Sequence, residues 1–132
     1  MINKLFSNVD VLKAGLDASW LKKKVIANNI ANVDTPNFKS SSVSFEAAFK
    51  RALQGGEFTA KKTREKHIDF EGTDMRPTVT TDYSTTYRMD GNNVNIDAES
   101  AKLAKNQIFY NALAQQLSSE FRKLTVAING GK

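Results

Sequence analysis

Cysteine is absent from this chain of 132 residues. A disulfide framework, a thiolate metal site and a cysteine nucleophile are therefore excluded. The sequence also lacks an apolar run long enough to cross a membrane. Near the amino terminus, Asn8, Asp10 and Lys13 interrupt the region in which a secretory signal needs its apolar stretch. We therefore expect neither a membrane span nor a cleavable signal peptide.

Residues that carry catalytic or cofactor chemistry are scarce as well. The only histidine is His67, and on an extended strand His67, Asp69 and Glu71 would share one face and could hold a divalent metal. Alternation with Ile68 and Phe70 is also what any half-buried strand shows, and we favour that interpretation. The Lys-Ser or Lys-Thr that follows a phosphate-binding glycine loop is missing too. We expect no enzyme, no metal and no cofactor.

Charge is distributed unevenly along the chain, whose formal net charge is +5. Residues 1–33 carry five lysines against two aspartates, and residues 98–132 carry five basic against two acidic residues. The middle, residues 34–97, has nine basic and ten acidic residues. Because the two terminal segments have the same sign, any charge complementarity is with another region or another chain.

A basic helical adaptor that binds nucleic acid or a membrane surface is an alternative function. Its best support is the basic run Lys61–Lys66, which Glu65 interrupts. Nucleic-acid sites gather basic and aromatic residues on one face, whereas Lys22–Lys24 would point around a helix. We favour a solvated loop and a contribution of these charges to solubility.

An apolar seam near the amino terminus is the clearest structural signal. Apolar residues recur there at alternating steps of four and three, interrupted only at Ser19 and Lys23. They are Leu5, Val9, Leu12, Leu16, Ile26, Ile30 and Val33. This spacing predicts an amphipathic helix from Lys4 to Val33, about 45 Å long. Asp34–Pro36 ends it, because proline lacks an N–H and disfavours helical backbone in the residue before it.

A second seam lies in the carboxyl-terminal region. Its positions are Leu103, Asn106, Tyr110, Leu113, Leu117, Phe121, Leu124 and Ile128. Two consecutive four-residue steps, from Leu113 to Leu117 to Phe121, predict a stutter that locally unwinds a left-handed supercoil. We expect this helix to start near Asp97 as its N-cap and to fray at Asn129–Gly131.

A short amphipathic helix is predicted in the middle of the chain. Phe45, Phe49 and Leu53 share one helical face behind a cap at Ser44. The pair Gly55–Gly56 would end this helix.

The remaining middle segment is polar. Thr78–Tyr87, rich in hydroxyls, predicts either an exposed β segment or mobile chain, and Asp90–Asn93 is a turn signal before the last helix. The predicted fold class is mainly α, with long terminal helices packed as an antiparallel, coiled-coil-like pair. We expect one domain, divided into a helix at 1–33, a loop-rich variable middle at 34–97 and a helix at 98–132.

Two helices alone leave their outer faces uncovered. Trp20, Val25, Phe109 and Ala112 fall on those faces of the predicted helices. Neighbouring subunits are the natural cover, so we expect the isolated chain to be partly unfolded at its ends.

Three carboxamides interrupt the end of the first helix. Asn28 and Asn32 are four residues apart and share a face, while Asn29 points elsewhere. Buried amides fix register because each is costly when unpaired, whereas amides at a fraying helix end are simply hydrated. The residues alone leave both interpretations open.

The segment Ala27–Phe38 resembles a signature of bacterial flagellar rod, hook and hook-associated axial proteins. In that family the pattern A-N-N-[IL]-A-N-x-x-T-x-x-[FY] follows an amphipathic helix near the amino terminus. The chain length and the stretch Tyr87–Glu99 are similar to a short basal-body rod protein, with another short rod component such as FlgC as the alternative. One departure is Asn37, where many relatives carry glycine. Asparagine tolerates left-handed backbone, so we expect the turn to be preserved.

The resemblance implies which residues contact other subunits. The motif residues are Asn28, Asn29, Asn32, Thr35 and Phe38, and Asp90, Gly91, Asn92 and Asn93 form the turn before the last helix. The apolar and amide positions of the two seams, from Leu5 to Ile30 and from Leu103 to Ile128, complete the expected interaction surface.

The resemblance also implies a role. It is that of a structural subunit of the proximal rod of the flagellar basal body, which assembles helically through its terminal helices and links the membrane ring to the axial shaft. The implied partners are other copies, the rod proteins FlgC, FlgF, FlgG and FliE, the rod base at the membrane ring, and the type III export apparatus. The implied location is outside the cytoplasmic membrane, reached without a cleavable signal.

Overall fold

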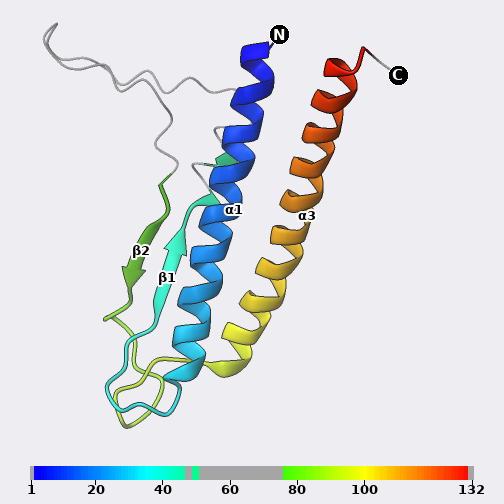
Figure 1. Cartoon of the computed structure of the whole chain (residues 1–132). Helices are drawn as coiled ribbons and strands as arrows, with labels where there is room; N and C mark the ends of the chain where they lie inside the picture. The colour runs from blue at the N-terminus through cyan, green and yellow to red at the C-terminus, as the bar shows by residue number, and fades with distance from the viewer. Residues whose placement is uncertain (1, 47–48, 51–75, 131–132) are drawn as a thin grey trace, which may run out of the picture.

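The computed structural model describes residues 2–46, 49–50 and 76–130, with side chains from residue 8 onward. Its elements are helix α1 (Ile2–Ala31), strand β1 (Ser41–Ser44), strand β2 (Thr78–Thr81) and helix α3 (Ile96–Ile128). The two strands form one antiparallel sheet beside α1 (Figure 1). The predicted fold class, mainly α with long terminal helices, is confirmed.

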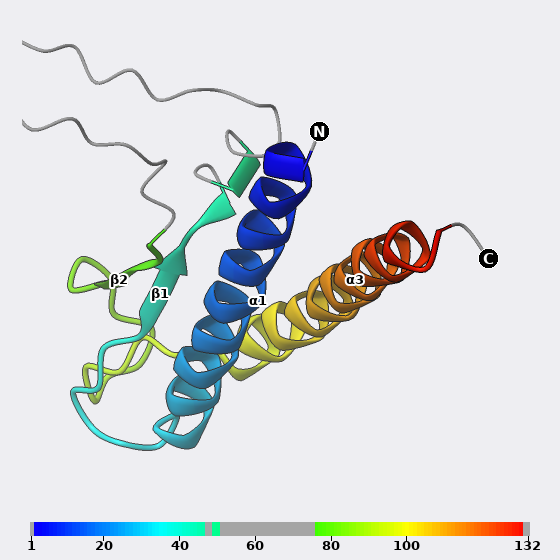
Figure 2. The same ribbon diagram turned by 45° about the horizontal axis from the view of Figure 1, so that its top comes forward.

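Helices α1 and α3 run antiparallel, so the two chain ends lie at the same end of the molecule (Figure 1). The helices are closest where α1 ends and α3 begins, and they diverge toward the chain ends (Figure 2). Near the end of α3, Phe121 is 51% and Ile128 82% exposed, whereas Glu120 is still buried. The pair is tightly packed at one end and open at the other.

The caps of α3 differ partly from the prediction. The N-cap is Asn95, whose side chain accepts hydrogen bonds from the N–H groups of Asp97 and Ala98. The predicted cap at Asp97 is wrong, because extended backbone at Asn95 brings its amide oxygen over the first turn. Asp97 instead lies within that turn, where a negative charge is favourable. At the other end α3 stops at Ile128, where the fraying at Asn129–Gly131 was predicted, with Asn129 as its C-cap and Gly130 at φ +70°.

Helix α3 keeps a strict seven-residue repeat on its buried side. The buried positions are Glu99, Asn106, Leu113 and Glu120. The predicted stutter is therefore wrong, because Glu120 and not Phe121 continues the buried line. A carboxylate can take this place since Glu120 accepts hydrogen bonds from Lys123 at 2.8 Å and Gln116 at 3.2 Å.

The buried side of α1 agrees with the predicted seam at alternate positions only. The positions that agree are Leu12, Ser19 and Ile26. At two other seam positions, Leu16 and Ile30 are only half-buried, and the preceding residues Gly15 and Asn29 are buried instead. The hydrophobic pattern predicted burial of Leu16 and Ile30. In the structure the small Gly15 and the polar Asn29 are buried in their place.

The close approach at Gly15 explains this shift. A Cβ atom there would lie 2.8 Å from Cε2 of Phe49 and 3.0 Å from Cδ1 of Leu113. The surrounding core consists of Val11, Leu12, Ala18, Phe45, Phe49 and Leu113, with Leu16, Phe109 and Leu117 packed against it. Phe109, predicted on an uncovered face, instead meets Phe49 edge to face at 5.7 Å. Trp20 is 59% exposed, as expected for an outer face.

The described part of the middle supports both of its predicted elements. Glu46, Phe49 and Lys50 are helical, and the burial of Phe45 and Phe49 confirms the apolar face of the short helix. Leu53 and the pair Gly55–Gly56 lie outside the described residues. Ser44, the predicted cap, is the last residue of strand β1.

The exposed β segment is confirmed as strand β2. Its partner β1 was not predicted, because a stretch as short and rich in serine as Ser41–Ser44 gives no strand signal. The three-part division of the chain stays a prediction.

Candidate subunit-interaction site

The carboxamide of Asn29 lies where α1, β1 and α3 meet, and it is only 1% exposed. Its Nδ2 donates to the backbone oxygen of Ser41 at 2.8 Å and to Oε2 of Glu99 at 2.9 Å. Its Oδ1 accepts from the N–H of Ser41 at 3.0 Å. The second carboxylate oxygen of Glu99 accepts from Lys102 at 2.6 Å. One side chain of α1 thus holds both the strand and the start of α3.

Asn92 lies against the turn that follows α1 and is completely buried. Its Nδ2 donates to the backbone oxygens of Asn32, Val33 and Thr35 at 2.9, 3.0 and 2.9 Å. These three carbonyls lie in the turn that follows α1, so this amide holds the chain where it leaves the helix. Its Oδ1 accepts from the N–H of Val94 at 2.7 Å, which fixes the approach to α3.

The neighbouring Asn93 binds residues that flank the two strands. Its Nδ2 donates to the backbone oxygen of Asp82 at 2.8 Å and to the hydroxyl of Thr85 at 3.1 Å. Its Oδ1 accepts from the N–H of Ser40 at 2.7 Å. We call Asn29, Asn92, Asn93 and Glu99 the amide hub, because together they join α1, the strands and α3.

The turn beside the hub requires left-handed backbone at two contacting residues. Asn37 has φ +59°, so the expectation that asparagine preserves this turn is confirmed. Its N–H donates to the backbone oxygen of Asp90 at 2.8 Å. Gly91 has φ +82°, and a Cβ atom there would lie 2.5 Å from Oδ1 of Asn37. The predicted turn at Asp90–Asn93 is present, and only glycine fits its second position.

Arg88 binds the same turn after α1 from its exposed side. Its guanidinium donates to the backbone oxygen of Val33 at 3.0 Å and to Asp34 at 2.9 Å. The hydrogen bond that Arg88 donates to Asp34 and the nearby charge of Asp90 raise the pKa of Arg88 above its ordinary value. Because the group is exposed, we assign it a role in holding the turn rather than a large share of stability.

A second amide contact lies further along the helix pair. Asn106 donates to the backbone oxygen of Ser19 at 2.9 Å and accepts from its hydroxyl at 3.0 Å. Ser19 looked like an interruption of the seam, yet it is 3% exposed and pairs with the buried amide of α3. Polar partners in matching heptad positions fix the register of the two helices.

The predicted interaction residues fall into three groups. Those buried within the single chain are Leu12, Ile26, Asn29, Asn106 and Leu113. Those half-buried are Val9, Leu16, Ile30, Asn32, Phe38, Leu103, Leu117 and Leu124. Those exposed are Asn28, Thr35, Tyr110, Phe121 and Ile128. Leu5 belongs to α1, and its side chain lies outside the described part.

The two interpretations of the asparagine cluster apply to different residues. Asn29 is the buried register amide, whereas Asn28 is exposed. Asn32 makes local bonds, donating to the backbone oxygen of Asn28 at 2.8 Å and accepting from Thr35 at 3.2 Å. Sequence reasoning missed Glu99 and Glu120, although their seven-residue spacing from Asn106 and Leu113 was a usable signal.

The features behind the alternative functions lie outside the described residues. This applies to the candidate metal ligands His67, Asp69 and Glu71 and to the basic run Lys61–Lys66. In the part of the chain that the structure describes, no acidic or histidine cluster is arranged to hold a metal. Neither of the described long helices has the apolar length needed to cross a membrane.

Comparison with known proteins gives matches both to the segment that contains Asn29 and to nearly the whole chain. A family described as flagella basal body rod protein matches residues 15–39, which include Asn29 and the turn at Asn37. The flagellar basal body rod protein FlgB of Bacillus subtilis (strain 168) is 40% identical, over 97% of this chain and 98% of the relative. FlgB of Borrelia hermsii is 35% identical, over 92% of this chain and 95% of the relative. The chain belongs to the FlgB family. FlgB of Escherichia coli (strain K12) is 25% identical over 99% of both chains.

Membership of the FlgB family decides between the alternatives left open by the sequence. The chain is a structural subunit of the flagellar basal body rod. Within the axial proteins, the near full-length match favours FlgB over another short rod component. The hub and the diverging helix ends are therefore features of a protein whose role is assembly.

Proposed function

We propose that this FlgB-family chain builds the proximal rod by helical packing of its terminal helices and links the membrane ring to the axial shaft. The main support for this proposal is the divergence of the two helices toward the chain ends. The hub fixes α1 against α3 at one end, while Phe121 and Ile128 at the other end lack apolar cover within the described residues. Large exposed apolar groups at a helix end are typical of surfaces that bind another protein.

The exposed members of the predicted interaction set are the proposed subunit contacts. They are Asn28, Thr35, Tyr110, Phe121 and Ile128. The proposed partners are other copies and the rod proteins FlgC, FlgF, FlgG and FliE, together with the rod base at the membrane ring. The half-buried seam residues toward the open end, Val9, Leu117 and Leu124, would become fully buried when neighbouring helices cover it.

We also propose that the chain reaches the rod through the type III export apparatus and acts outside the cytoplasmic membrane. Export in an unfolded state would suit a chain whose helix ends find cover only after assembly. The hub would then form once the two terminal segments meet.

Replacement of the Bacillus subtilis relative by this chain tests the proposed function. We expect the chain to be recovered in purified basal bodies and motility to be restored at least in part. Phe121→Asp should abolish both. Val79→Asp is the matched control, because Val79 is 48% exposed against 51% for Phe121 but lies on β2. Recovery of the chain in the cytoplasm alone, in cells without rods, would refute the proposal.

A further inference from the structure

A groove lies between β1 and α3, with α1 as its floor. Its volume is about 290 Å³. Val25 and Ile26 form the floor, Val43 lines the β1 side, and Phe109 lines the α3 side. This volume is at the lower limit of small-molecule pockets, which span roughly 300–1,000 Å³. The groove is therefore of a size to hold a single large side chain.

The charged residues of the groove are paired within the chain, with one exception. Lys22 forms an ion pair with Glu46, and Lys102 forms one with Glu99. Lys105 lines the groove as well, and it makes no ion pair with any residue of the described ranges. The groove therefore presents apolar walls and one uncompensated cation.

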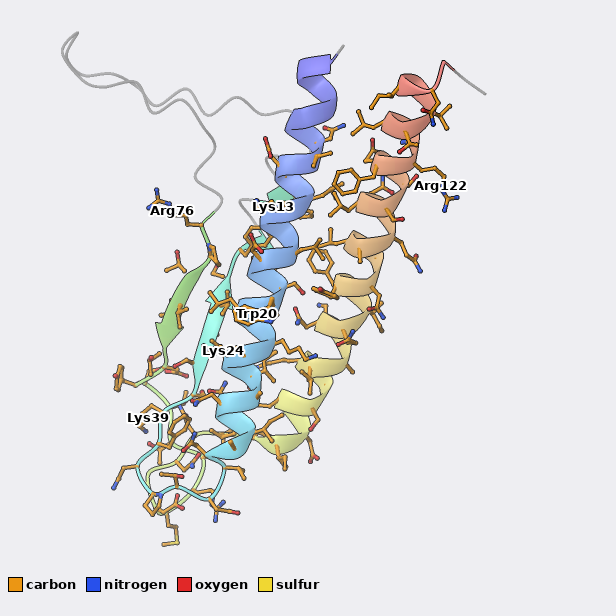
Figure 3. All side chains as sticks on the ribbon, in the orientation of Figure 1. Lys13, Trp20, Lys24, Lys39, Arg76 and Arg122 are labelled. Atoms are coloured by element: carbon orange, nitrogen blue, oxygen red, sulfur yellow. The ribbon has the colours of Figure 1, made fainter. Side chains whose placement is uncertain are left out.

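Trp20 lies on the opposite side of α1. Lys22 and Ile26, which line the groove, are about 200° and 240° further round the helix from Trp20. The indole is 59% exposed, and the ammonium of Lys24 lies 5.7 Å from its centroid. Figure 3 shows Trp20 and Lys24 on the side of α1 that is away from α3. One turn earlier, Asp17 is exposed and forms no ion pair with a described residue.

We propose that the groove of one copy binds Trp20 of a second copy, with Asp17 of the second copy pairing with Lys105 of the first. This inference rests on the proposed function and names one contact of that assembly. Tryptophan is enriched among the side chains that anchor protein interfaces in well-packed pockets, and the two unpaired charges have opposite sign. Binding would bury the one tryptophan of the chain and satisfy both charges.

The positions of anchor and groove determine the kind of assembly. They occupy opposite sides of α1, so each copy offers its Trp20 to one neighbour and its groove to another. Such a contact is heterologous, and it produces a ring when the rotation closes or a helix when it does not. Either product is compatible with a cylindrical rod.

The fluorescence of Trp20 reports the contact directly, because the chain has no other tryptophan. In the full chain at rising concentration, we expect association in sedimentation velocity together with a blue shift and weaker quenching by iodide. Trp20→Ala should weaken association roughly thirtyfold. Any of three results would overturn the proposal. The chain associates while iodide still quenches Trp20 fully, the Trp20→Ala variant associates as strongly as the wild type, or the chain does not associate at all.

A charge exchange tests the partner residues. Asp17→Lys alone and Lys105→Glu alone should each weaken association roughly five- to tenfold through like-charge contacts. An equimolar mixture of the two variants should recover wild-type association, because each anchor then meets a groove of opposite charge. Arg122→Glu is the control and should associate normally, since Arg122 lies on α3 outside the groove. A mixture no stronger than either variant would refute the pairing.

The two proposals can fail separately. If the chain is recovered in basal bodies while Trp20→Ala assembles normally, the contact is wrong and the rod function stands. If the chain associates through Trp20 but never enters basal bodies, the contact stands and the proposed function falls.

Discussion

The carboxamide of Asn29 donates a 2.9 Å hydrogen bond to the carboxylate of Glu99, 70 residues later in the chain. Both side chains are buried, with exposures of 1% and 3%. The bond joins the last turns of α1 to the first turn of α3. It lies at the end of the helix pair where the helices are closest, so polar groups fix the register there and the apolar ends remain free for neighbours.

Asn29→Leu should lower the free energy of unfolding by about 2–4 kcal/mol, because it leaves backbone groups of Ser41 and one oxygen of the buried Glu99 carboxylate without a partner. Asn28→Leu is the matched control, one residue earlier and exposed, and should change stability by less than about 0.5 kcal/mol. Urea unfolding followed by circular dichroism measures both. Equal effects of the two variants would contradict the hub.

Gly15→Ala should destabilise the chain, although alanine is the better helix former. The added methyl would lie 2.8 Å from Phe49 and 3.0 Å from Leu113. Overpacking costs about 1–3 kcal/mol, against a gain of about 1 kcal/mol in helix propensity. Adding Leu113→Val should make room and reduce the cost. A double-mutant cycle by thermal unfolding measures this coupling, and strictly additive effects would show that the helices do not meet there.

Gly91→Ala should cost about 1–2 kcal/mol from left-handed backbone alone, plus the clash with Asn37. That clash arises because the added Cβ would lie 2.5 Å from Oδ1 of Asn37. Asn37→Gly removes the amide and itself favours φ +59°. The double variant should therefore regain the part of the loss that comes from the clash. If it is no more stable than Gly91→Ala, the two residues are not in contact.

Asp82 should titrate at unusually low pH. Hydrogen bonds from the side chain of Ser84, then from that of Thr85, lower the pKa of Asp82 from 3.8 to about 2. Because the folded pKa is the lower one, the stabilisation is present above pH 3.8 and is lost as the pH falls toward 2. Ser84→Ala should raise this pKa toward its ordinary value. Carbon-detected NMR titration of the carboxyl group measures both, and an ordinary pKa in the unmodified chain would contradict the bonding.

The terminal helices could be predicted from the sequence because their apolar residues repeat at heptad spacing. The residues that hold the helices together could not, since Ser19 and Glu120 are polar and a pattern of hydrophobic residues assigns them to solvent. Their burial depends on partners that only the folded chain supplies, Asn106 for Ser19, and Lys123 with Gln116 for Glu120.

The asparagine cluster is a second case in which the sequence does not show which polar residues are buried. Helical spacing separates Asn29 from Asn28 and Asn32, but it does not say which side faces the protein. That depends on β1, whose residue Ser41 binds both polar groups of the Asn29 amide. The turn at Asn37 was predictable, because its requirement is local backbone geometry rather than a distant partner.

Hydrogen exchange along α3 tests most directly whether the open helix ends find their cover only in the assembled rod. In the isolated chain, amides near Asn106 and Leu113 should exchange slowly, whereas those from Phe121 to Ile128 should exchange rapidly. In purified rods both groups should be protected. Slow exchange throughout both helices of the isolated monomer would contradict the account.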